Sequence, residues 1–323
     1  MLNLFHTLVF VANKCRRKFN PLKNESRFKI FTPFISKVLQ VLYSSIIYNY
    51  LIRYKNKYRK SSKNAVCEVI SIVSHKDLIM YLVAISTFMY FVRRSVLITV
   101  FDDGSLINED TLLLKRLIPE IRIVKKSDCD TKIKKIIKDK LIIKYRDYSP
   151  IIRKVIDLHI LSVKRKLIYL DSDIIFFRIP TEIIKWIDVG KDDLFFMNDP
   201  FDAYSLSNVE IMHITNIKLI PKMNIGLMGF YKDVVDLKLL SDIFSFFDNN
   251  TFDRTIKVLD QTIFSVWFSA ANKYEKIRLN KQYLVTVDKH VIRDVICRHY
   301  FSVPGIRELF YKDALYALNK MSE

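Results

Sequence analysis

Two aspartates, Asp171 and Asp173, stand between two of the most apolar stretches of the chain, in the run KLIYLDSDIIFFRIP. Residues two apart in an extended chain point the same way, so both carboxylates can face one pocket. Two like charges in one pocket raise each other's pKa unless a cation joins them. A hard divalent ion such as Mn2+ or Mg2+ accepts carboxylate oxygens and retains open positions for phosphate oxygens. The pair therefore favours a metal site for a diphosphate, although D-x-D is also a common loop composition.

The segments around this pair alternate between predicted strands and predicted helices. Apolar, β-branched runs predict strands at 65–75, 95–101, 120–126 and 166–170, and helices are predicted at 78–92, 107–119 and 150–166. Apolar strands separated by helices predict a mostly parallel sheet covered on both faces, a Rossmann-like α/β fold. Ligands of such sheets collect beyond the carboxyl ends of the strands, where Asp171 is expected.

Several classes of site lack support. The chain has only 5 Gly and contains neither GxGxxG nor GxxxxGK[ST], so dinucleotide and P-loop sites are disfavoured. The cysteines Cys15, Cys67, Cys129 and Cys297 stand far apart with no CxxC spacing. This excludes an evident zinc site or disulfide framework and fits a reducing compartment.

Three further stretches follow the aspartate pair: KMNIGLMGFYKD at 222–233, LDQTIFSVWFS at 259–269 and CRHYFSVPG at 297–305. In this order, the four stretches resemble the nucleotide-sugar glycosyltransferases of the A-type fold (GT-A). The likeness is greatest to family 8, which includes glycogenin and bacterial lipooligosaccharide galactosyltransferases. It covers roughly Val66 to Leu309.

The resemblance implies roles for the matched residues. It implies that Mn2+ or Mg2+ is held by Asp171, Asp173 and His299. The family has an Arg one helix before the D-x-D, and Arg153 and Lys154 both stand near that place. The choice between them stays open. The implied donor-binding residues are Arg153, Lys154, Asp171, Ser172 and Asp173, and the implied sugar-pocket residues are Asn224, Gly226, Asp260 and Gln261.

Each of these residues also has a purely structural interpretation. Asn224 and Gly226 could form only a turn, and Asp260 could be a helix N-cap. His299 could be an ordinary packed histidine, and the family's usual Lys pattern after the late His is missing here. Asp199, in FFMNDPFDAY, follows another apolar run and is a candidate for binding the sugar or the acceptor, although NDP is also a good turn.

The resulting hypothesis is a metal-dependent glycosyltransferase that moves a sugar from a nucleoside diphosphate, with UDP favoured, to an acceptor hydroxyl. The resemblance implies retention of anomeric configuration; an inverting enzyme would need a carboxylate base, for which Asp199 or Asp260 could be proposed. The acceptor, a glycan, a lipid-linked sugar or a protein, stays open. A nucleotidyltransferase would use the same aspartate pair, but the segment after ISIVSH lacks a Gly-rich or basic loop for a triphosphate.

The remaining alternative is a basic binding module. The chain has 53 Lys and Arg against 34 Asp and Glu, a net charge of +19, and the surplus is concentrated between Lys14 and Lys63. Residues 1–63 are predicted to be a basic, helical N-terminal extension and 64–323 the catalytic domain. No export signal is evident, so we expect a cytoplasmic protein whose residues 1–60 contact an anionic membrane. Nucleic-acid binding is not expected, because no recognised motif occurs.

Overall fold

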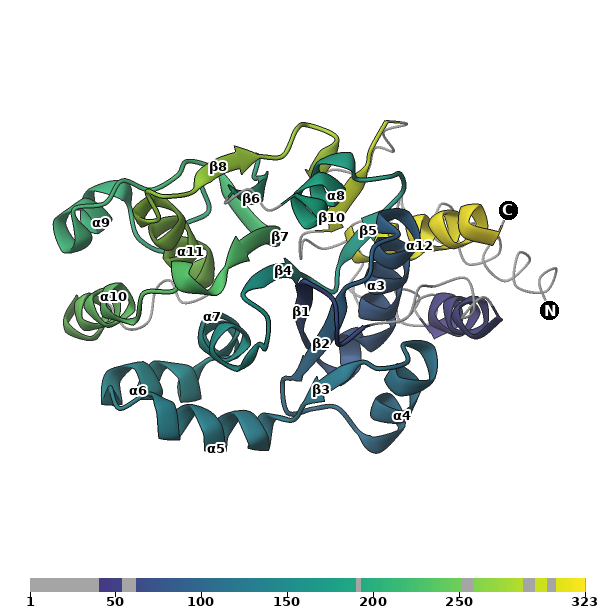
Figure 1. The fold of residues 1–323 in the computed structure, drawn as a ribbon, viewed down its shortest axis with the longest axis horizontal. Helices are drawn as coiled ribbons and strands as arrows, with labels where there is room; N and C mark the ends of the chain where they lie inside the picture. The colour runs from purple at the N-terminus through teal and green to yellow at the C-terminus, as the bar shows by residue number, and fades with distance from the viewer. Residues whose placement is uncertain are drawn as a thin grey trace, which may run out of the picture.

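The computed structural model describes residues 41–53, 62–189, 193–250, 258–286, 294–300 and 306–322. In this part of the chain the strands form one 10-stranded sheet, and helices cover both of its faces (Figure 1). The order along the sheet is β3-β2-β1-β4-β7-β6-β9-β10-β5, with β8 paired to β6. Most neighbouring strands are parallel, which confirms the predicted Rossmann-like α/β fold.

The first half of the sheet is the parallel part that the apolar runs predicted. Its strands are β1 (Cys67–Val73), β2 (Leu97–Asp102), β3 (Arg122–Val124) and β4 (Lys166–Leu170). β4 is buried at every residue, because its side chains meet helices on both faces.

The second half mixes strand directions and brings distant segments together. Its strands are β5 (Ile174–Phe176), β6 (Asp193–Asn198), β7 (Met223–Tyr231), β8 (Glu275–Arg278), β9 (Tyr283–Thr286) and β10 (Cys297–Tyr300). β7 lies antiparallel to both β4 and β6. β10 lies antiparallel to β5, with His299 opposite Ile174. The segment after the aspartate pair is thus next to the late histidine.

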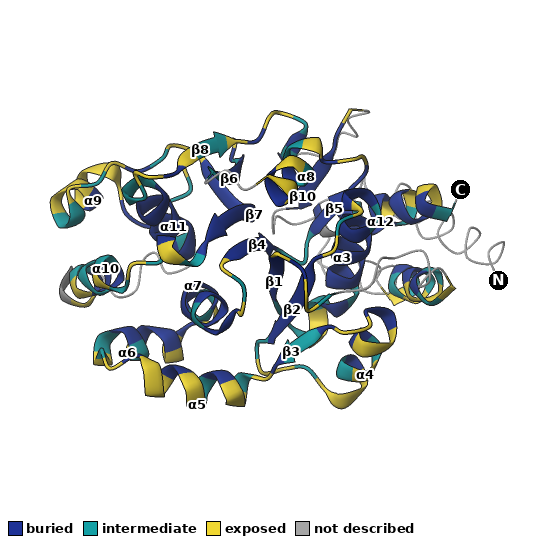
Figure 2. Ribbon diagram, viewed as in Figure 1, coloured by how far each residue is buried: buried dark blue, intermediate teal, exposed yellow. Residues whose placement is uncertain are grey.

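The helices pack on the sheet as two layers. They are α3 (Leu78–Val92), α4 (Asn108–Leu117), α5 (Lys126–Ile136), α6 (Lys140–Tyr148), α7 (Pro150–Leu161), α8 (Thr181–Asp188), α9 (Asn208–Thr215), α10 (Leu237–Asn250), α11 (Leu259–Ala270) and α12 (Ile306–Ser322), with short 3-10 turns η2 (His75–Asp77) and η3 (Lys232–Val234). α3 is almost wholly buried, as expected (Figure 2). Across the described residues, no helix is both long and apolar enough to span a membrane.

The predicted end of the helix that begins at Pro150 was wrong. α7 ends at Leu161 instead of continuing to Lys166. The reason is the fully buried Glu68 of β1, whose carboxylate accepts the backbone N–H of Val163 at 2.7 Å and of Lys164 at 2.8 Å. These bonds end the helix and turn the chain into β4. The start is as predicted, with Pro150 at the first position, where its missing N–H costs nothing.

Part of the basic N-terminal segment packs on the rest of the molecule. Residues 41–53 form a helix in which Tyr43, Ile47 and Leu51 are buried in the main core. The ring of Tyr43 stacks on that of Tyr311 in α12, with centroids 6.3 Å apart. Residues 1–40 and 54–61 lie outside the described part, so the division at residue 63 stays a prediction.

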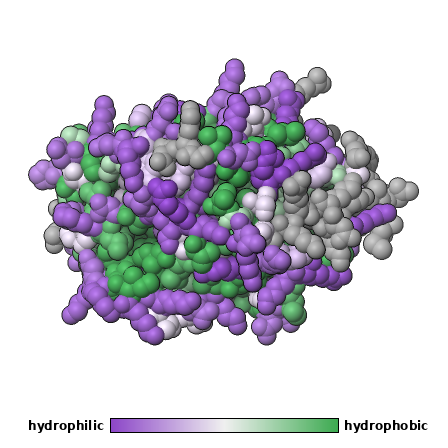
Figure 3. Space-filling model, in the orientation of Figure 1, coloured by the Kyte–Doolittle hydropathy of each residue, from purple (hydrophilic) through white to green (hydrophobic). Residues whose placement is uncertain are grey.

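One face of the molecule shows how hydrophilic and apolar side chains are distributed over the described residues. On the face drawn in Figure 3, hydrophilic side chains spread over most of the area. Apolar residues gather at the lower left, in the region of α6 and α7, and hydrophilic side chains border them.

Candidate active site

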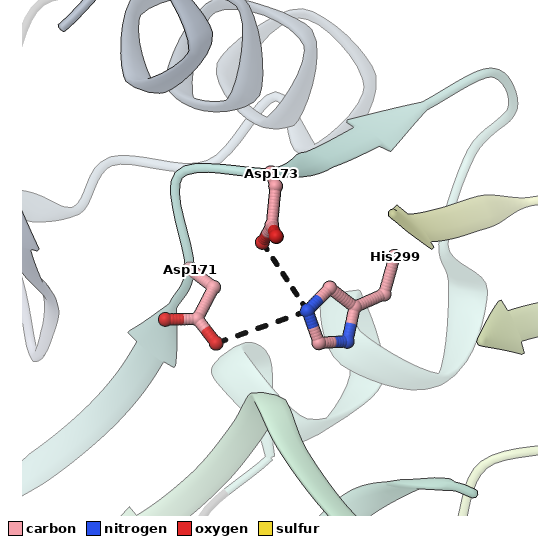
Figure 4. Close-up of side chains that lie close together, drawn as sticks. All are labelled: Asp171, Asp173 and His299. Carbon is pink, nitrogen blue, oxygen red and sulfur yellow. Dashed lines mark ion pairs between the residues drawn. The ribbon is translucent and has the colours of Figure 1, made fainter. Parts of the chain in front are cut away.

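Three side chains meet at the carboxyl end of β4. Asp171 follows β4, Asp173 precedes β5, and His299 comes from β10 (Figure 4). Their ligand atoms all lie within 4.8 Å of one another. His299 Nε2 is 3.2 Å from Asp173 Oδ1 and 3.9 Å from Asp171 Oδ2. The backbone N–H of Tyr300 donates to the Asp173 carbonyl at 2.9 Å, which fixes β10 beside this turn.

The charges of this group call for a cation. Burial raises the pKa of Asp171, Lys154 opposes that rise, and the charge of Asp173 adds to it. Burial lowers the pKa of His299. The negative charges of Asp173 and Asp171 raise this pKa by more than burial lowers it, so the net shift is upward. Two carboxylate oxygens and one imidazole nitrogen suit a divalent ion such as Mn2+. The residues present therefore fit the metal that the sequence predicted.

Lys154 and Arg153, which the sequence could not separate, point to different places. Lys154 Nζ is 3.2 Å from Asp260 Oδ2 and 3.5 Å from both Asp171 carboxylate oxygens. Burial lowers the pKa of Lys154, but Asp171 and Asp260 raise it more, so the amine stays charged. Arg153 Nη1 instead donates to the Asp103 carbonyl at 2.7 Å. Neighbouring helix residues point about 100° apart, so only Lys154 reaches the aspartates.

Tyr169 is a member of the site that sequence reasoning missed. Its hydroxyl donates to Asp171 Oδ1, and its ring lies 4.3 Å below Lys154 Nζ. The available signal was the strand period, since Tyr169 and Asp171 are two residues apart and share a face. The tyrosine therefore supports both the first aspartate and the lysine.

Asn224 and Gly226 lie inside β7, so the turn interpretation was wrong. Asn224 Oδ1 accepts the Gly226 N–H at 3.0 Å and lies 3.0 Å from His299 Nδ1. Asn224 Nδ2 donates to Asp199 Oδ1 at 3.1 Å. Gly226 serves by its small size, because a Cβ there would lie 2.5 Å from His299 Cε1.

Asp199, Asp260 and Gln261 complete the arrangement from β6 and α11. Gln261 Nε2 donates to Asp199 Oδ2 at 2.8 Å and to the Ala203 carbonyl at 3.0 Å. Burial raises the pKa of Asp199, against the bonds from Gln261 and Asn224. Asp260 lies within the first turn of α11, whose N-cap is Val258, so the N-cap interpretation of Asp260 was wrong.

The other sequence candidates have weaker support. Ser172 is half-buried between the aspartates, and no hydrogen bond of its side chain is seen within the described residues. Phe301 to Gly305, where the family's Lys pattern is missing, lie outside those residues. Among the described residues, Cys67, Cys129 and Cys297 are buried, free thiols.

No protein-family model matches the chain, and no curated protein matches it by sequence. Solved structures match its fold. The galactosyltransferase LgtC, in complex with donor and acceptor sugar analogues, has a TM-score of 0.53 at 12% identity, covering 79% of this chain and 96% of its own. Mouse xyloside xylosyltransferase 1 in its apo form has a TM-score of 0.50 at 11% identity, covering 74% and 98%. The chain therefore has the Rossmann-like A-type fold of these glycosyltransferases, as its motifs predicted.

Proposed function

We propose that this protein is a metal-dependent glycosyltransferase that moves a sugar from a nucleoside diphosphate, with UDP favoured, to an acceptor hydroxyl. The observation that carries the proposal is the cluster of Asp171, Asp173 and His299 at the carboxyl end of β4. Open α/β sheets bind ligands at this edge. The likeness to a galactosyltransferase and a xylosyltransferase supports the same assignment.

Asp171, Asp173 and His299 would hold the ion, and Mn2+ is favoured over Mg2+ because one ligand is an imidazole nitrogen. When bound, the ion would stabilise the negative charge that develops on the leaving diphosphate. Lys154 adds a second positive charge beside Asp171 and is already held in place by Asp260 and Tyr169. A preorganised cation of this kind stabilises developing charge without having to reorient during the reaction.

The neighbouring polar residues are suited to hold the donor sugar. Asp199, Asp260 and Gln261 converge on the same edge of the sheet as the aspartate pair. Asp199 accepts from two amide groups and Asp260 pairs with Lys154. Because both carboxylates are engaged by the protein, neither is well placed as a free general base. This supports a retaining reaction, as the resemblance implies.

The proposal leaves the class of acceptor open and includes a location for the protein. A glycan, a lipid-linked sugar or a protein could supply the hydroxyl. The basic composition of residues 1–60 supports peripheral contact with an anionic membrane on its cytoplasmic side.

The test is a screen of nucleotide sugars for Mn2+-dependent release of nucleoside diphosphate. We expect release from one class of nucleotide sugar. Release of pyrophosphate from a nucleoside triphosphate would instead indicate a nucleotidyltransferase. Asp171→Asn and Asp173→Ala should abolish release while circular dichroism stays unchanged. Asp188→Asn is a matched control, because Asp188 pairs with Arg94 on the surface at 2.7 Å. Wild-type turnover in EDTA would contradict the proposal.

A further inference from the structure

Asn224 is surrounded by groups whose hydrogen-bonding roles are fixed by their chemistry. The Gly226 backbone N–H can only donate, and it lies 3.0 Å from Asn224 Oδ1. The amide oxygen must therefore face Gly226. The amide nitrogen then faces Asp199, whose Oδ1 lies 3.1 Å from Nδ2. The two ends of this side-chain amide can thus be told apart from their partners alone.

The same oxygen favours Nδ1 as the nitrogen that carries the single hydrogen of a neutral His299 imidazole. His299 Nδ1 lies 3.0 Å from Asn224 Oδ1. An amide oxygen only accepts, so the hydrogen of that bond belongs to Nδ1. A neutral imidazole has one such hydrogen, which leaves Nε2 with a free lone pair. Nε2 is the atom that faces Asp171 and Asp173.

We propose that Asn224 is a positioning residue that fixes the Nδ1-protonated tautomer of His299 and so keeps Nε2 available as a metal ligand. The metal part of this proposal rests on the proposed function, whereas the tautomer does not. Metal-binding histidines usually donate their second ring N–H to an oxygen acceptor, which sets the tautomer and the ring orientation. Here the acceptor is an asparagine from β7.

The hydrogen-bonding capacity of Asn224 supports this role over direct contact with a sugar. Its oxygen already has two partners, Gly226 and His299, and one of its two amide hydrogens is used by Asp199. The residue is only 2% exposed. Gln261 holds the far carboxylate oxygen of Asp199 at 2.8 Å, which keeps Asp199 turned toward Asn224. Asn224 is therefore held between two fixed partners.

Removing Asn224 should change the tautomer in a predictable direction. Without an acceptor at Nδ1, the hydrogen is better placed on Nε2, where Asp173 Oδ1 can accept it at 3.2 Å. Asn224→Leu removes the acceptor with little change in volume. Asn224→Asp keeps an acceptor oxygen for Nδ1. Asn198→Leu is the matched control, because Asn198 lies in β6 and its side chain contacts Arg278.

The tautomer can be measured from nitrogen-15 spectra of metal-free protein containing labelled histidine, recorded above the titration midpoint of His299. The spectrum of His299→Ala identifies the His299 signals among the 6 histidines. We expect the Nδ1–H form in the wild type, Asn224→Asp and Asn198→Leu, and the Nε2–H form in Asn224→Leu. Calorimetric titration with Mn2+ should show an affinity about 10 to 100 times lower for Asn224→Leu.

Asn224→Ala replaces the leucine variant if circular dichroism shows that leucine prevents folding. Persistence of the Nδ1–H form without Asn224 would overturn the proposal, as would an Nε2–H form in the wild type. The two parts of the proposal can fail separately. If the wild type binds no Mn2+, the proposed metal site is contradicted. If the tautomer still switches in Asn224→Leu, the control of the tautomer by Asn224 is supported.

Discussion

The protonation of His299 should depend on whether a metal ion is bound. Protonation at Nε2 competes with metal binding, and the pKa of His299 is raised above the ordinary 6.5, mainly because Asp173 outweighs burial. As the pH is lowered, Mn2+ affinity should therefore begin to fall while the pH is still above 6.5, and more Mn2+ should restore activity. Calorimetry across this range measures the effect, and a flat profile would indicate that His299 is not a ligand.

The metal-free protein should show the opposite dependence. A folded-state pKa above the unfolded value means that the protonated imidazole stabilises the fold at low pH. This contribution is complete below about pH 6.5 and is lost as the pH rises through the raised pKa. Melting temperatures in EDTA, compared between the wild type and His299→Ala, isolate the contribution of this residue. Parallel curves for the two proteins would contradict the pKa shift.

At the scale of the element, α7 places two consecutive cations in different surroundings, and exchanging each for methionine separates their roles. Lys154→Met should lower turnover about 100-fold, because the leaving diphosphate loses a preorganised charge. Its Mn2+ affinity should stay equal or rise, since a competing cation near Asp171 is removed. Arg153→Met should leave turnover near wild type. Loss of activity only in the Arg153 variant would reverse this assignment.

β7 offers a matched pair of glycines for a test of packing. In Gly226→Ala the new Cβ would lie 2.5 Å from His299 Cε1, and in Gly229→Ala it would lie 2.1 Å from Phe195 Cε1. Each variant should lose about 1 to 3 kcal/mol of unfolding free energy through overpacking. Only Gly226→Ala should also weaken Mn2+ binding, because only there must the imidazole move. Equal Mn2+ affinities in the two variants would show that the ring position is not critical.

The same elements show what a single sequence can predict. The apolar runs predicted β1, β2, β4 and α3, because burial on both faces leaves a local compositional signal. A short run with Ile and Val also predicted β3, which is only partly buried. The pairing of β10 with β5 depends on packing between residues far apart in the chain, and no local pattern carries it. The prediction that Asp171, Asp173 and His299 lie together rested only on the resemblance of the ordered motifs to a known family. The strand period could have paired Tyr169 with Asp171, whereas the contacts of Tyr169 with Lys154 and of Asn224 with His299 needed the structure, since each joins two different elements.

At the scale of the whole molecule, the residues of the candidate site come from both halves of the sheet. Asp171 and Lys154 belong to the parallel half, and His299 and Asn224 to the mixed half. The halves join where β7 lies beside β4, and there the Asp171 N–H donates to the Gly226 carbonyl at 2.8 Å. The short turn that carries Asp171 and Asp173 is therefore held by β4 at one end and by β5 at the other, which limits how far these carboxylates can move from His299.

The effect of truncating the N-terminal segment should depend on where the truncation ends. Deleting residues 1–60 would remove Tyr43, Ile47 and Leu51, which are buried in the core. Each buried aliphatic side chain contributes about 1.5 to 3 kcal/mol, so this variant should melt at a clearly lower temperature. Deleting residues 1–40 leaves the 41–53 helix in place and should preserve both the melting temperature and donor hydrolysis.

The shorter truncation also tests membrane contact. Residues 1–40 are rich in Lys and Arg and contain one acidic residue, Glu25. Basic segments bind anionic bilayers with about 1 kcal/mol for each Lys or Arg near the surface, and salt screens this attraction. The full chain should therefore sediment with anionic liposomes and much less with neutral ones, and the protein lacking residues 1–40 should bind the anionic liposomes more weakly. If the full chain and the protein lacking residues 1–40 bind anionic liposomes equally at low salt, residues 1–40 are not the membrane contact.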